Sequence, residues 1–406
     1  MSEIKQGYKQ TKVGIIPEDW EDIKIKDIVK VSQGLQIAID DRFTTPAHNR
    51  VFYITIPFIE GKKEEYIENP KSSTLCKKDD ILVVRTGSGV GKIIRGVEGA
   101  FHNNFFKVKP SDNINIDFFY YFLTSPRVQF LMAKYAGNSA IPDLNHGDFY
   151  SLDFLIPPLK EQEKIAEILT TWDEAITKQT ELLRAKELQK KALMQKLLSG
   201  EVRFSGFSDE WEEVRIDKLF DFKKGQELSK EKLEKNGIFE CILYGELYTT
   251  YSEVISEIKS KTNIKEGIKS KIDDILIPAS TTTSAIDLAI ASTIQKDNVL
   301  IGGDINILRK KTNNINGEFI SKYLTHIKKM EIAKYAQGIT IIHLYSKDFK
   351  HLKIQLPSLP EQQKIAEVLS LADDEINLLK TELEELNLQK KALMQKLLTG
   401  QVRVKV

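Results

Sequence analysis

The chain has 406 residues, of which 41% are hydrophobic and 29% are charged, and its formal net charge is +1. A chain of this length exceeds one typical core and predicts two to three domains. No apolar run approaches the ~18 residues that span a bilayer, and the first residues do not read as a secretory signal, so we expect a cytoplasmic protein. The only two cysteines, Cys76 and Cys241, exclude a cysteine-based zinc module.

The charge balance limits how this chain can bind nucleic acid. Residues 1–157 contain 20 Lys and Arg against 20 Asp and Glu, and residues 201–357 contain 24 against 23. A protein that binds DNA alone usually has a strong basic excess, because phosphate neutralisation dominates its affinity. Any DNA contact therefore needs a local basic face, or a partner protein that supplies part of the positive charge.

Residues 1–157 are predicted to form a mixed α/β domain. Short β-branched and aromatic runs, such as DDILVVRT and NNFFKVKP, are separated by turn signals, and the helical pattern DFFYYFLTSPRVQFLMAKY follows. The loop TGSGVGKI resembles a phosphate-binding loop. However, Thr86 and Ile93 stand where that loop has a glycine and a magnesium-binding Ser or Thr. We interpret the segment as a turn between strands; the functional alternative is a loop that faces DNA.

Residues 158–200 are predicted to form a long helix. At ~1.5 Å per residue it would extend on the order of 60 Å. Its apolar residues recur with the 4,3 spacing of a coiled-coil seam, although Gln179, Lys186 and Lys190 fall on the same seam. The apolar seam residues are Ile165, Leu169, Ile176, Leu183, Leu193 and Leu197. This pattern predicts that the helix packs against a second long helix.

The second half of the chain repeats the first. Residues 161–200 and 361–400 align without a gap at 22 of 40 positions, and the run QKKALMQKLL is identical in both. Residues 201–357 repeat 1–157 more weakly and are again mixed α/β. The final stretch, 358–406, predicts a second long helix, with a seam of Ile365, Leu369, Ile376, Leu383, Leu393 and Leu397. The chain is therefore a tandem duplication.

Motifs for catalysis are missing, whereas side chains suited to DNA contacts recur in the loops. The sequence has no dinucleotide-binding fingerprint, no His-Glu-x-x-His and no Asn/Asp-Pro-Pro-aromatic methyltransferase signature. Arg, Lys, Asn, Gln, Ser and Thr beside glycine are suited to base edges and phosphates. The candidates are Gln33, Arg85, Thr86, Ser88, Asn103, Asn104, Lys134, Asn138, Lys223, Lys224, Gln226, Ser280, Thr281, Thr282, Thr283, Lys334, Gln337 and Thr340. Arg85 and Gln226 can each make bidentate base contacts, although any single candidate is equally well explained as a solvated loop residue.

Three kinds of segment together resemble the specificity subunits of type I restriction-modification systems. They are the opening GYKQTKVGIIPEDW, the helix starts IPPLKEQEKIAEIL and LPSLPEQQKIAEVL, and the ends QKKALMQKLL-x-G-x-V-R. The resemblance implies two target recognition domains, 1–157 and 201–357, separated by two long antiparallel coiled-coil helices, 158–200 and 358–406. The fold class would be duplicated α/β (mixed α+β) domains in a pseudo-two-fold internal repeat.

The same resemblance implies a non-catalytic subunit that reads a bipartite, asymmetric DNA site. It would direct adenine methylation and, with a restriction subunit, DNA cleavage. The implied partners are double-stranded DNA, two modification (methyltransferase) subunits and restriction (translocase and nuclease) subunits. S-adenosylmethionine, ATP and Mg would be bound by the partner subunits, and no cofactor or metal is expected on this chain.

Two other classes of function remain open on the sequence alone. One is a coiled-coil adaptor that binds only proteins, which a salt-dependent DNA-binding assay of the methylase complex distinguishes. The other is a fused nuclease or methylase with an unrecognised active site. Incubating the purified chain with DNA, S-adenosylmethionine, ATP and magnesium distinguishes that alternative.

Overall fold

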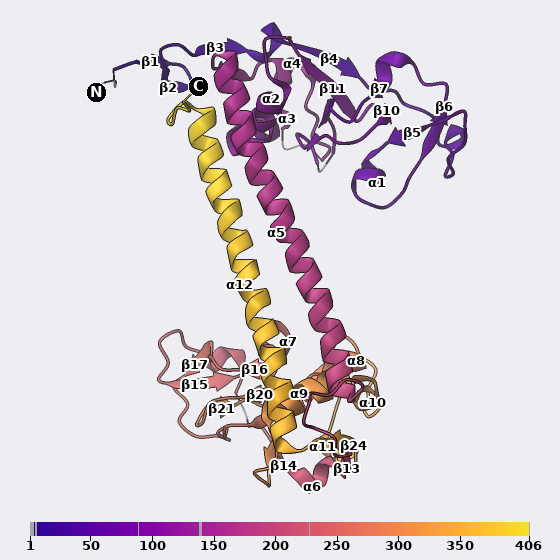
Figure 1. Cartoon of the computed structure of the whole chain (residues 1–406), viewed down its shortest axis with the longest axis vertical. Coiled ribbons are helices and arrows are strands. Elements are labelled where there is room, and N and C mark those ends of the chain that lie inside the picture. The colour runs from indigo at the N-terminus through magenta and orange to yellow at the C-terminus, as the bar shows by residue number, and fades with distance from the viewer. Residues whose placement is uncertain (1–3, 5, 88, 138–139, 227, 406) are drawn as a thin grey trace. The chain divides into compact units, whose positions relative to one another are not determined.

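A computed structural model describes residue 4 and residues 6–87, 89–137, 140–226 and 228–405. The chain divides into two compact units: unit 1 is Met1–Thr180 with Thr381–Val406, and unit 2 is Glu181–Lys380. The two long ribbons in Figure 1 are α5 (Leu159–Ser199) and α12 (Leu359–Leu398). Because each long helix contributes one end to each unit, the units do not follow the boundaries of the sequence repeat. Among the described helices, none combines the length and apolarity that a membrane crossing requires.

Unit 1 is built on two four-stranded sheets within its described residues. One sheet has the order β4 (Val29–Gln33), β11 (Phe105–Pro110), β8 (Ile81–Val84) and β9 (Ile93–Ile94). The other has the order β6 (Tyr66–Glu68), β5 (Arg50–Ile54), β10 (Gly99–Phe101) and β7 (Leu75–Cys76). Two further pairs are β1 (Tyr8–Thr11) with β2 (Gly14–Pro17), and β3 (Glu21–Lys24) with β12 (Asp153–Ile156). The helices are α1 (Ile56–Ile59), α2 (Ile116–Thr124), α3 (Pro126–Ala136) and α4 (His146–Tyr150).

Unit 2 has a five-stranded and a three-stranded sheet within its described residues. The larger has the order β14 (Phe220–Lys224), β22 (Ile305–Lys310), β18 (Asp274–Pro278), β20 (Ser292–Ile294) and β16 (Val254–Ile255). The smaller has the order β17 (Ser260–Thr262), β15 (Phe239–Ile242) and β21 (Leu300–Ile301). Two further pairs are β13 (Glu212–Arg215) with β24 (Lys353–Leu356), and β19 (Ser280–Thr281) with β23 (Ile342–His343). The helices are α6 (Ile216–Leu219), α7 (Glu246–Thr249), α8 (Ala285–Leu288), α9 (Gly317–His326), α10 (Lys329–Ala333) and α11 (Ser346–Phe349).

The strand orders confirm the predicted duplication of a mixed α+β fold. The order β4-β11-β8 of unit 1 recurs as β14-β22-β18 in unit 2, and the β3–β12 pair recurs as β13–β24. The helical stretch predicted in the first half is broken into α2 and α3, and its counterpart in the second half is broken into α9 and α10. In unit 1 the break occurs because Ser125 caps α3 and Pro126 occupies its first turn, so α2 cannot continue.

The apolar seam residues near the helix ends belong to the cores of the units. Ile165, Leu169 and Leu397 are fully buried in unit 1, where they pack in the same core as Phe118 and Phe154. In unit 2 the corresponding seam residues, Ile365, Leu369 and Leu197, are likewise buried. The long helices are therefore parts of the two folded units as well as connections between them.

Polar residues on the seam pair with acidic residues of the other long helix. In unit 1 Lys390 forms an ion pair with Asp173, and the Gln179 side chain donates to Glu382 at 2.8 Å. In unit 2 Lys190 pairs with Asp373, Lys186 with Glu375 at 2.7 Å, and Lys380 with Glu187 at 3.1 Å. In both units the residue numbers rise along one helix as they fall along the other, so the helices pack antiparallel. These ion pairs favour this register of the seam, because a shifted register would leave the partly buried side chains of Lys190 and Lys390, 20% and 19% exposed, without these partners.

The segment after each long helix clamps the start of the other helix. In unit 1 Arg403 donates to Glu161 at 2.7 and 2.8 Å, and Trp20 Nε1 donates to the same carboxylate at 3.0 Å. Unit 2 repeats this arrangement with Arg203, Glu361 and Trp211. The side chains of Glu161 and Glu361 are each only 1% exposed. Within each unit, the Gly-x-Val-Arg segment therefore connects the end of one long helix to the start of the other.

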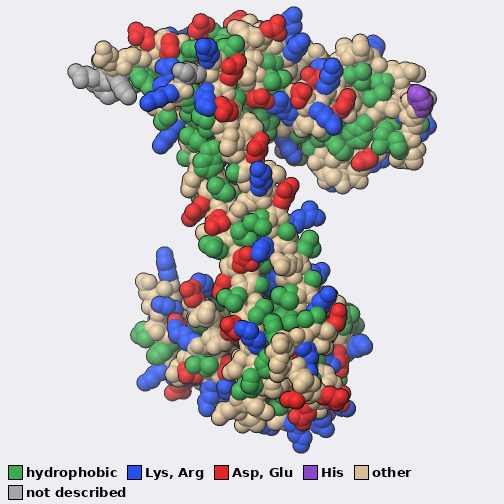
Figure 2. Space-filling view, in the orientation of Figure 1, with side chains coloured by type: hydrophobic (Ala, Val, Ile, Leu, Met, Phe, Trp, Pro, Cys, Tyr) green, Lys and Arg blue, Asp and Glu red, His purple; other side chains and the backbone are tan. Residues whose placement is uncertain are grey.

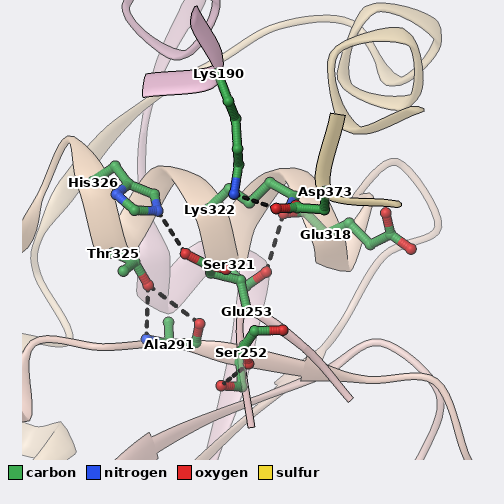
Figure 3. Close-up of polar contacts among 11 residues, drawn as sticks. Lys190, Ser252, Glu253, Ala291, Glu318, Ser321, Lys322, Thr325, His326 and Asp373 are labelled. Carbon is green, nitrogen blue, oxygen red and sulfur yellow. Dashed lines mark hydrogen bonds and ion pairs between the residues drawn. The ribbon is translucent and has the colours of Figure 1, made fainter. Parts of the chain in front are cut away.

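A charge cluster around the buried Lys322 joins α9 to both long helices in unit 2 (Figure 3). Lys322 is 1% exposed and donates to Asp373 at 2.8 Å, and Lys190 contacts the same carboxylate. One turn further along α9, His326 binds Glu253 at 2.6 Å. The hydrogen bond from His326 lowers the pKa of Glu253 to about 2. Unit 1 has Tyr121 in place of Lys322, and its hydroxyl donates to Asp173 at 2.8 Å.

Candidate DNA interface

Three neighbouring strands of unit 1 bring its candidate residues to one edge of a sheet. β4 ends at Gln33, β8 ends one residue before Arg85, and β11 begins one residue after Asn104. Because β11 runs antiparallel to both neighbours, the ends of β4 and β8 lie beside its start. This arrangement gathers Gln33, Arg85, Thr86, Asn103 and Asn104, which together with Asp143 we call edge 1.

Arg85 is held by an acidic side chain from a distant loop. Its Nε donates to Asp143 Oδ1 at 2.9 Å and its Nη2 to Oδ2 at 3.2 Å, and both side chains are partly exposed. Backbone contacts bring this loop to the edge, because Thr86 bridges to Asp143 and Leu144 N donates to Arg85 O at 2.9 Å. Burial lowers the pKa of the neighbouring His146, and the Arg85 charge lowers it further. His146 therefore stays neutral at pH 7, and Arg85 carries the positive charge here.

The amide side chains of edge 1 differ in how much they are engaged. Gln33 Nε2 donates to the backbone oxygens of Asn103 at 2.6 Å and Phe105 at 3.4 Å, which favours a structural role in the turn. Asn103 Nδ2 donates to Gln36 Oε1 at 3.0 Å.

The neighbouring Gly34 is required by a close approach of two backbone segments, because a Cβ there would lie 2.2 Å from His102 O. The same requirement at Gly225 explains why this glycine recurs in both halves of the sequence.

Lys134 lies apart from edge 1, exposed in the last turn of α3. That turn leads into the loop that carries Asp143, where Asp143 N donates to Ala136 O at 3.2 Å. The candidates Ser88 and Asn138 lie outside the described residues.

Unit 2 gathers its candidates in the same way. Lys224 ends β14, Pro278 ends β18 and Ile305 begins β22, so that residues of three strand ends again lie together. We call edge 2 the set Lys224, Gln226, Ser280, Thr281, Thr282, Thr283, Asp304 and His343. The loop that carries Gln337 reaches this edge because Gln337 and His343 exchange backbone hydrogen bonds and His343 pairs with Ser280.

Two hollows open on edge 2, and Asp304 lines both. One has a volume of about 670 Å³ and is lined by Tyr244, Tyr248, Thr282 and His343 among others. The other has a volume of about 680 Å³ and is lined by Lys224, Gln226 and Glu266 among others. Edge 2 therefore offers hydrogen-bonding side chains in a concave surface.

The candidate residues of unit 2 are not equally accessible. Ser280 and Thr281 are 6% and 9% exposed, and Thr283 donates to Asp287 at 2.6 Å, so Thr282 offers the most accessible hydroxyl of this run. Hydrogen bonds from Thr283 and Ser284 lower the pKa of Asp287, which keeps it ionised. Four further candidates are exposed: Lys223 beside edge 2, and Lys334, Gln337 and Thr340 on or before the loop that reaches it.

Edges 1 and 2 share a backbone framework but carry different side chains. Arg85 N donates to Asn104 O at 2.7 Å, and Ala279 N donates to Asp304 O at 2.7 Å. The pairing partners also correspond, since Gln33 lies opposite Phe106 and Lys224 opposite Asn306. Four matched positions therefore hold Gln33, Arg85, Asn104 and Asp143 in unit 1, and Lys224, Ala279, Asp304 and His343 in unit 2.

Asp143, Asp304 and His343 are not among the residues predicted from the sequence, because the predicted set consists of basic, amide and hydroxyl side chains. A signal for them exists, since 143 and 343, like 104 and 304, are separated by the 200-residue offset of the repeat. If the repeat alignment is extended through the loops at this offset, Asp143 aligns with His343 and Asn104 aligns with Asp304.

Charges of both signs are mixed on the surface of each unit. Figure 2 shows Lys and Arg interspersed with Asp and Glu on the visible face of each unit. Within the part of the chain that the structure describes, no group of three or more His, Cys, Asp or Glu side chains is arranged to hold a metal ion. Both cysteines are buried, and burial raises the pKa of each thiol to about 11.

Comparisons with known proteins identify the family. A family model described as "Type I restriction modification DNA specificity domain" matches residues 17–185 and 208–388. Two relatives from Methanocaldococcus jannaschii are similar over 99% of this chain. The MjaVIII specificity subunit is 24% identical over 97% of its own length, and the putative MjaX specificity subunit is 28% identical over 98%. The crystal structure of the type I S subunit from M. genitalium has the same fold, with a TM-score of 0.57 and 19% identity over 93% of this chain and 96% of that one.

The two matched ranges cover most of both halves of the repeat, and both relatives are named as specificity subunits of type I restriction enzymes, the second as a putative one. The predicted resemblance is therefore confirmed. The chain belongs to the type I restriction-modification DNA specificity family, as a DNA-recognising specificity subunit that carries two specificity domains.

Proposed function

We propose that edge 1 and edge 2 each read one half of a bipartite, asymmetric DNA site. The observation that carries this proposal is the pair of matched frameworks with four different side chains. Identical side chains on both edges would select two equivalent half-sites, whereas different hydrogen-bonding groups select different bases. The half-sites read by this chain are therefore unlike in sequence.

Arg85 is the base-reading residue of edge 1 that the geometry favours most. Asp143 engages the Nε and Nη2 side of its guanidinium group, which fixes the plane of the group. Nη1 makes no hydrogen bond to any described residue, so the Nη1 and Nη2 end is oriented for a second bidentate contact. Guanine presents the matching pair of acceptors, O6 and N7, in the major groove. Orienting the side chain before binding reduces the entropy cost of the contact.

Exposed lysines near each edge are suited to phosphate contacts. Lys134 and Lys334 occupy equivalent positions at the ends of helices, and Lys223 and Lys224 extend from the end of β14. Such contacts fix the position of a protein on DNA without reading the sequence.

The chemistry of the complex is assigned to partner subunits. We propose two modification subunits that bind S-adenosylmethionine, and restriction subunits that use ATP and Mg, in the cytoplasm. The near-neutral charge supports partners that supply further positive charge. Two copies of one modification subunit suit a duplicated chain: Phe130 and Met330, 67% and 64% exposed, occupy equivalent positions in the two units. An equivalent exposed apolar side chain in each unit offers the same kind of contact to each copy.

The test is to co-express the chain with its modification subunits and map the methylated adenines. We expect one asymmetric bipartite sequence, methylation only in the presence of the modification subunits, and DNA binding by the complex that weakens as salt rises. Methylation at sites with no shared sequence, or complexes that bind DNA equally well without this chain, would contradict the proposal. The second outcome would support the adaptor alternative.

A further inference from the structure

Asp304 holds an unusual position on edge 2. It follows Gly302 and Gly303, precedes β22, and has a positive φ of 58°, which few residues other than glycine adopt. Its backbone oxygen accepts from Ala279 N at 2.7 Å, which ties the residue to the chain just after β18. The side chain is 45% exposed and lines both hollows of edge 2.

The backbone conformation alone does not explain a carboxylate at this position. Glycine or asparagine satisfies a positive φ as well as aspartate does. The carboxylate accepts from Ser280 Oγ at 3.2 Å through Oδ2 and lies 3.4 Å from Lys224 Nζ through Oδ1. Two carboxylate oxygens accept about four hydrogen bonds, so further acceptor capacity remains on an oriented side chain.

An ionised carboxylate on a DNA-facing surface selects strongly among bases. It repels phosphates and can only accept hydrogen bonds, so it requires a donor on the base edge. Guanine and thymine present only acceptors to it in the major groove, at O6 and N7 or at O4. Adenine presents the N6 donor next to the N7 acceptor, which repels the carboxylate. Cytosine presents the N4 donor without a neighbouring acceptor.

We propose that Asp304 is a specificity-determining residue that selects a cytosine, through its N4 amino group, in the half-site read by unit 2. This inference rests on the proposed function and goes beyond it by naming a base and the residue that reads it. The equivalent residue of unit 1 is Asn104, whose amide both donates and accepts and so suits adenine N6 and N7. One position of the repeated framework therefore distinguishes the two half-sites.

The test compares Asp304→Asn with Asp221→Asn in the full chain bound to its modification subunits. Asp221 lies near the other end of β14, is 62% exposed, and pairs with Lys311 at 3.3 Å. Each substitution therefore removes one charge and releases one lysine, but only Asp304 faces edge 2. Asparagine tolerates a positive φ, so we expect Asp304→Asn to fold, and Asp304→Gly provides a second variant that keeps the conformation.

Methylated sites and competition binding are measured for each complex. In wild type we expect one base pair whose cytosine is required, with replacement weakening binding on the order of 10- to 100-fold. Asp304→Asn should lose this preference and favour adenine there, Asp304→Gly should lose it without a new preference, and Asp221→Asn should keep it. If Asp304→Asn keeps the wild-type site, or changes affinity uniformly as Asp221→Asn does, the inference is wrong while the proposed function stands. A wild-type complex with no bipartite site contradicts the proposed function itself.

Discussion

Replacing Arg403 with alanine tests whether the C-terminal segment completes unit 1. The Arg403 guanidinium donates to Glu161 at 2.7 and 2.8 Å and to Asp19 at 2.9 and 2.8 Å. Its hydrogen bond is the largest contribution that lowers the pKa of Asp19. The variant removes four hydrogen bonds between the C-terminal segment and the rest of unit 1, two to Glu161 and two to Asp19.

The expected loss is set by the burial of Glu161. Removing one partner of a buried ion pair costs about 3–5 kcal/mol, because the remaining charge stays buried without compensation. The Glu161 side chain is 1% exposed, but the Arg403 side chain is 36% exposed, so water can enter the vacated space and reduce the cost. Trp20 Nε1 still donates to the carboxylate at 3.0 Å. We therefore expect the free energy of unfolding to fall by about 2–3 kcal/mol.

Urea unfolding followed by tryptophan fluorescence measures this loss. Trp20 is completely buried in unit 1, so a background with Trp172 and Trp211 replaced by phenylalanine reports that unit. Lys405→Ala is the matched control, because it removes one positive charge from the same segment and forms none of the ion pairs found among the described residues. We expect the control to change stability by less than about 0.5 kcal/mol. If Arg403→Ala behaves like Lys405→Ala, the segment does not stabilise unit 1 and the reasoning is refuted.

Three further predictions concern recognition, assembly and pH. Arg85→Ala should weaken reading of one half-site by ~1–3 kcal/mol, measured by competition with single-base variants; a uniform loss on all DNA, with a shallower salt dependence, would indicate a phosphate contact instead. A fragment of residues 1–205, co-expressed with modification subunits, should form a symmetric pair that methylates a palindrome of the first half-site, because residues 181–205 repeat 381–405. Retention of the asymmetric site would contradict this prediction. The pKa of Glu253 in the folded protein is about 2, below its ordinary value of 4.5. Its ionised side chain therefore stabilises the fold fully above pH 4.5, and this stabilisation is lost as the pH falls towards 2. The stability gap between wild type and Glu253→Gln should thus shrink by about 2–3 kcal/mol on acidification, and a gap that is constant from pH 6 to pH 3 would refute this assignment.

Several features were predictable because they depend on local patterns. The duplication follows from an ungapped alignment, and the long helices follow from apolar periodicity with Pro360 near one helix start and Gly400 just beyond its end. The break between α2 and α3 was also readable, since Ser125 followed by Pro126 marks a new helix start. It was missed because the apolar pattern continues across it.

The pairing of polar seam residues was not predictable from one helix alone. Lys186, Lys190 and Gln179 weaken the apolar pattern of α5, and only the antiparallel register of α12 brings acidic side chains opposite them. Periodicity specifies which face of a helix is buried, but not which residue of its partner lies opposite.

The sequence by itself determined the repeat, the long helices, the family and the loops that carry suitable side chains, because these are properties of residue type and spacing along the chain. Only the tertiary structure decided which of those side chains can act. Antiparallel pairing and loop docking brought Asp143 to Arg85 and turned the Gln33 amide towards the backbone. They also placed Asp304 between two hollows. The direction of a side chain depends on backbone contacts with residues distant in sequence, which no local pattern encodes.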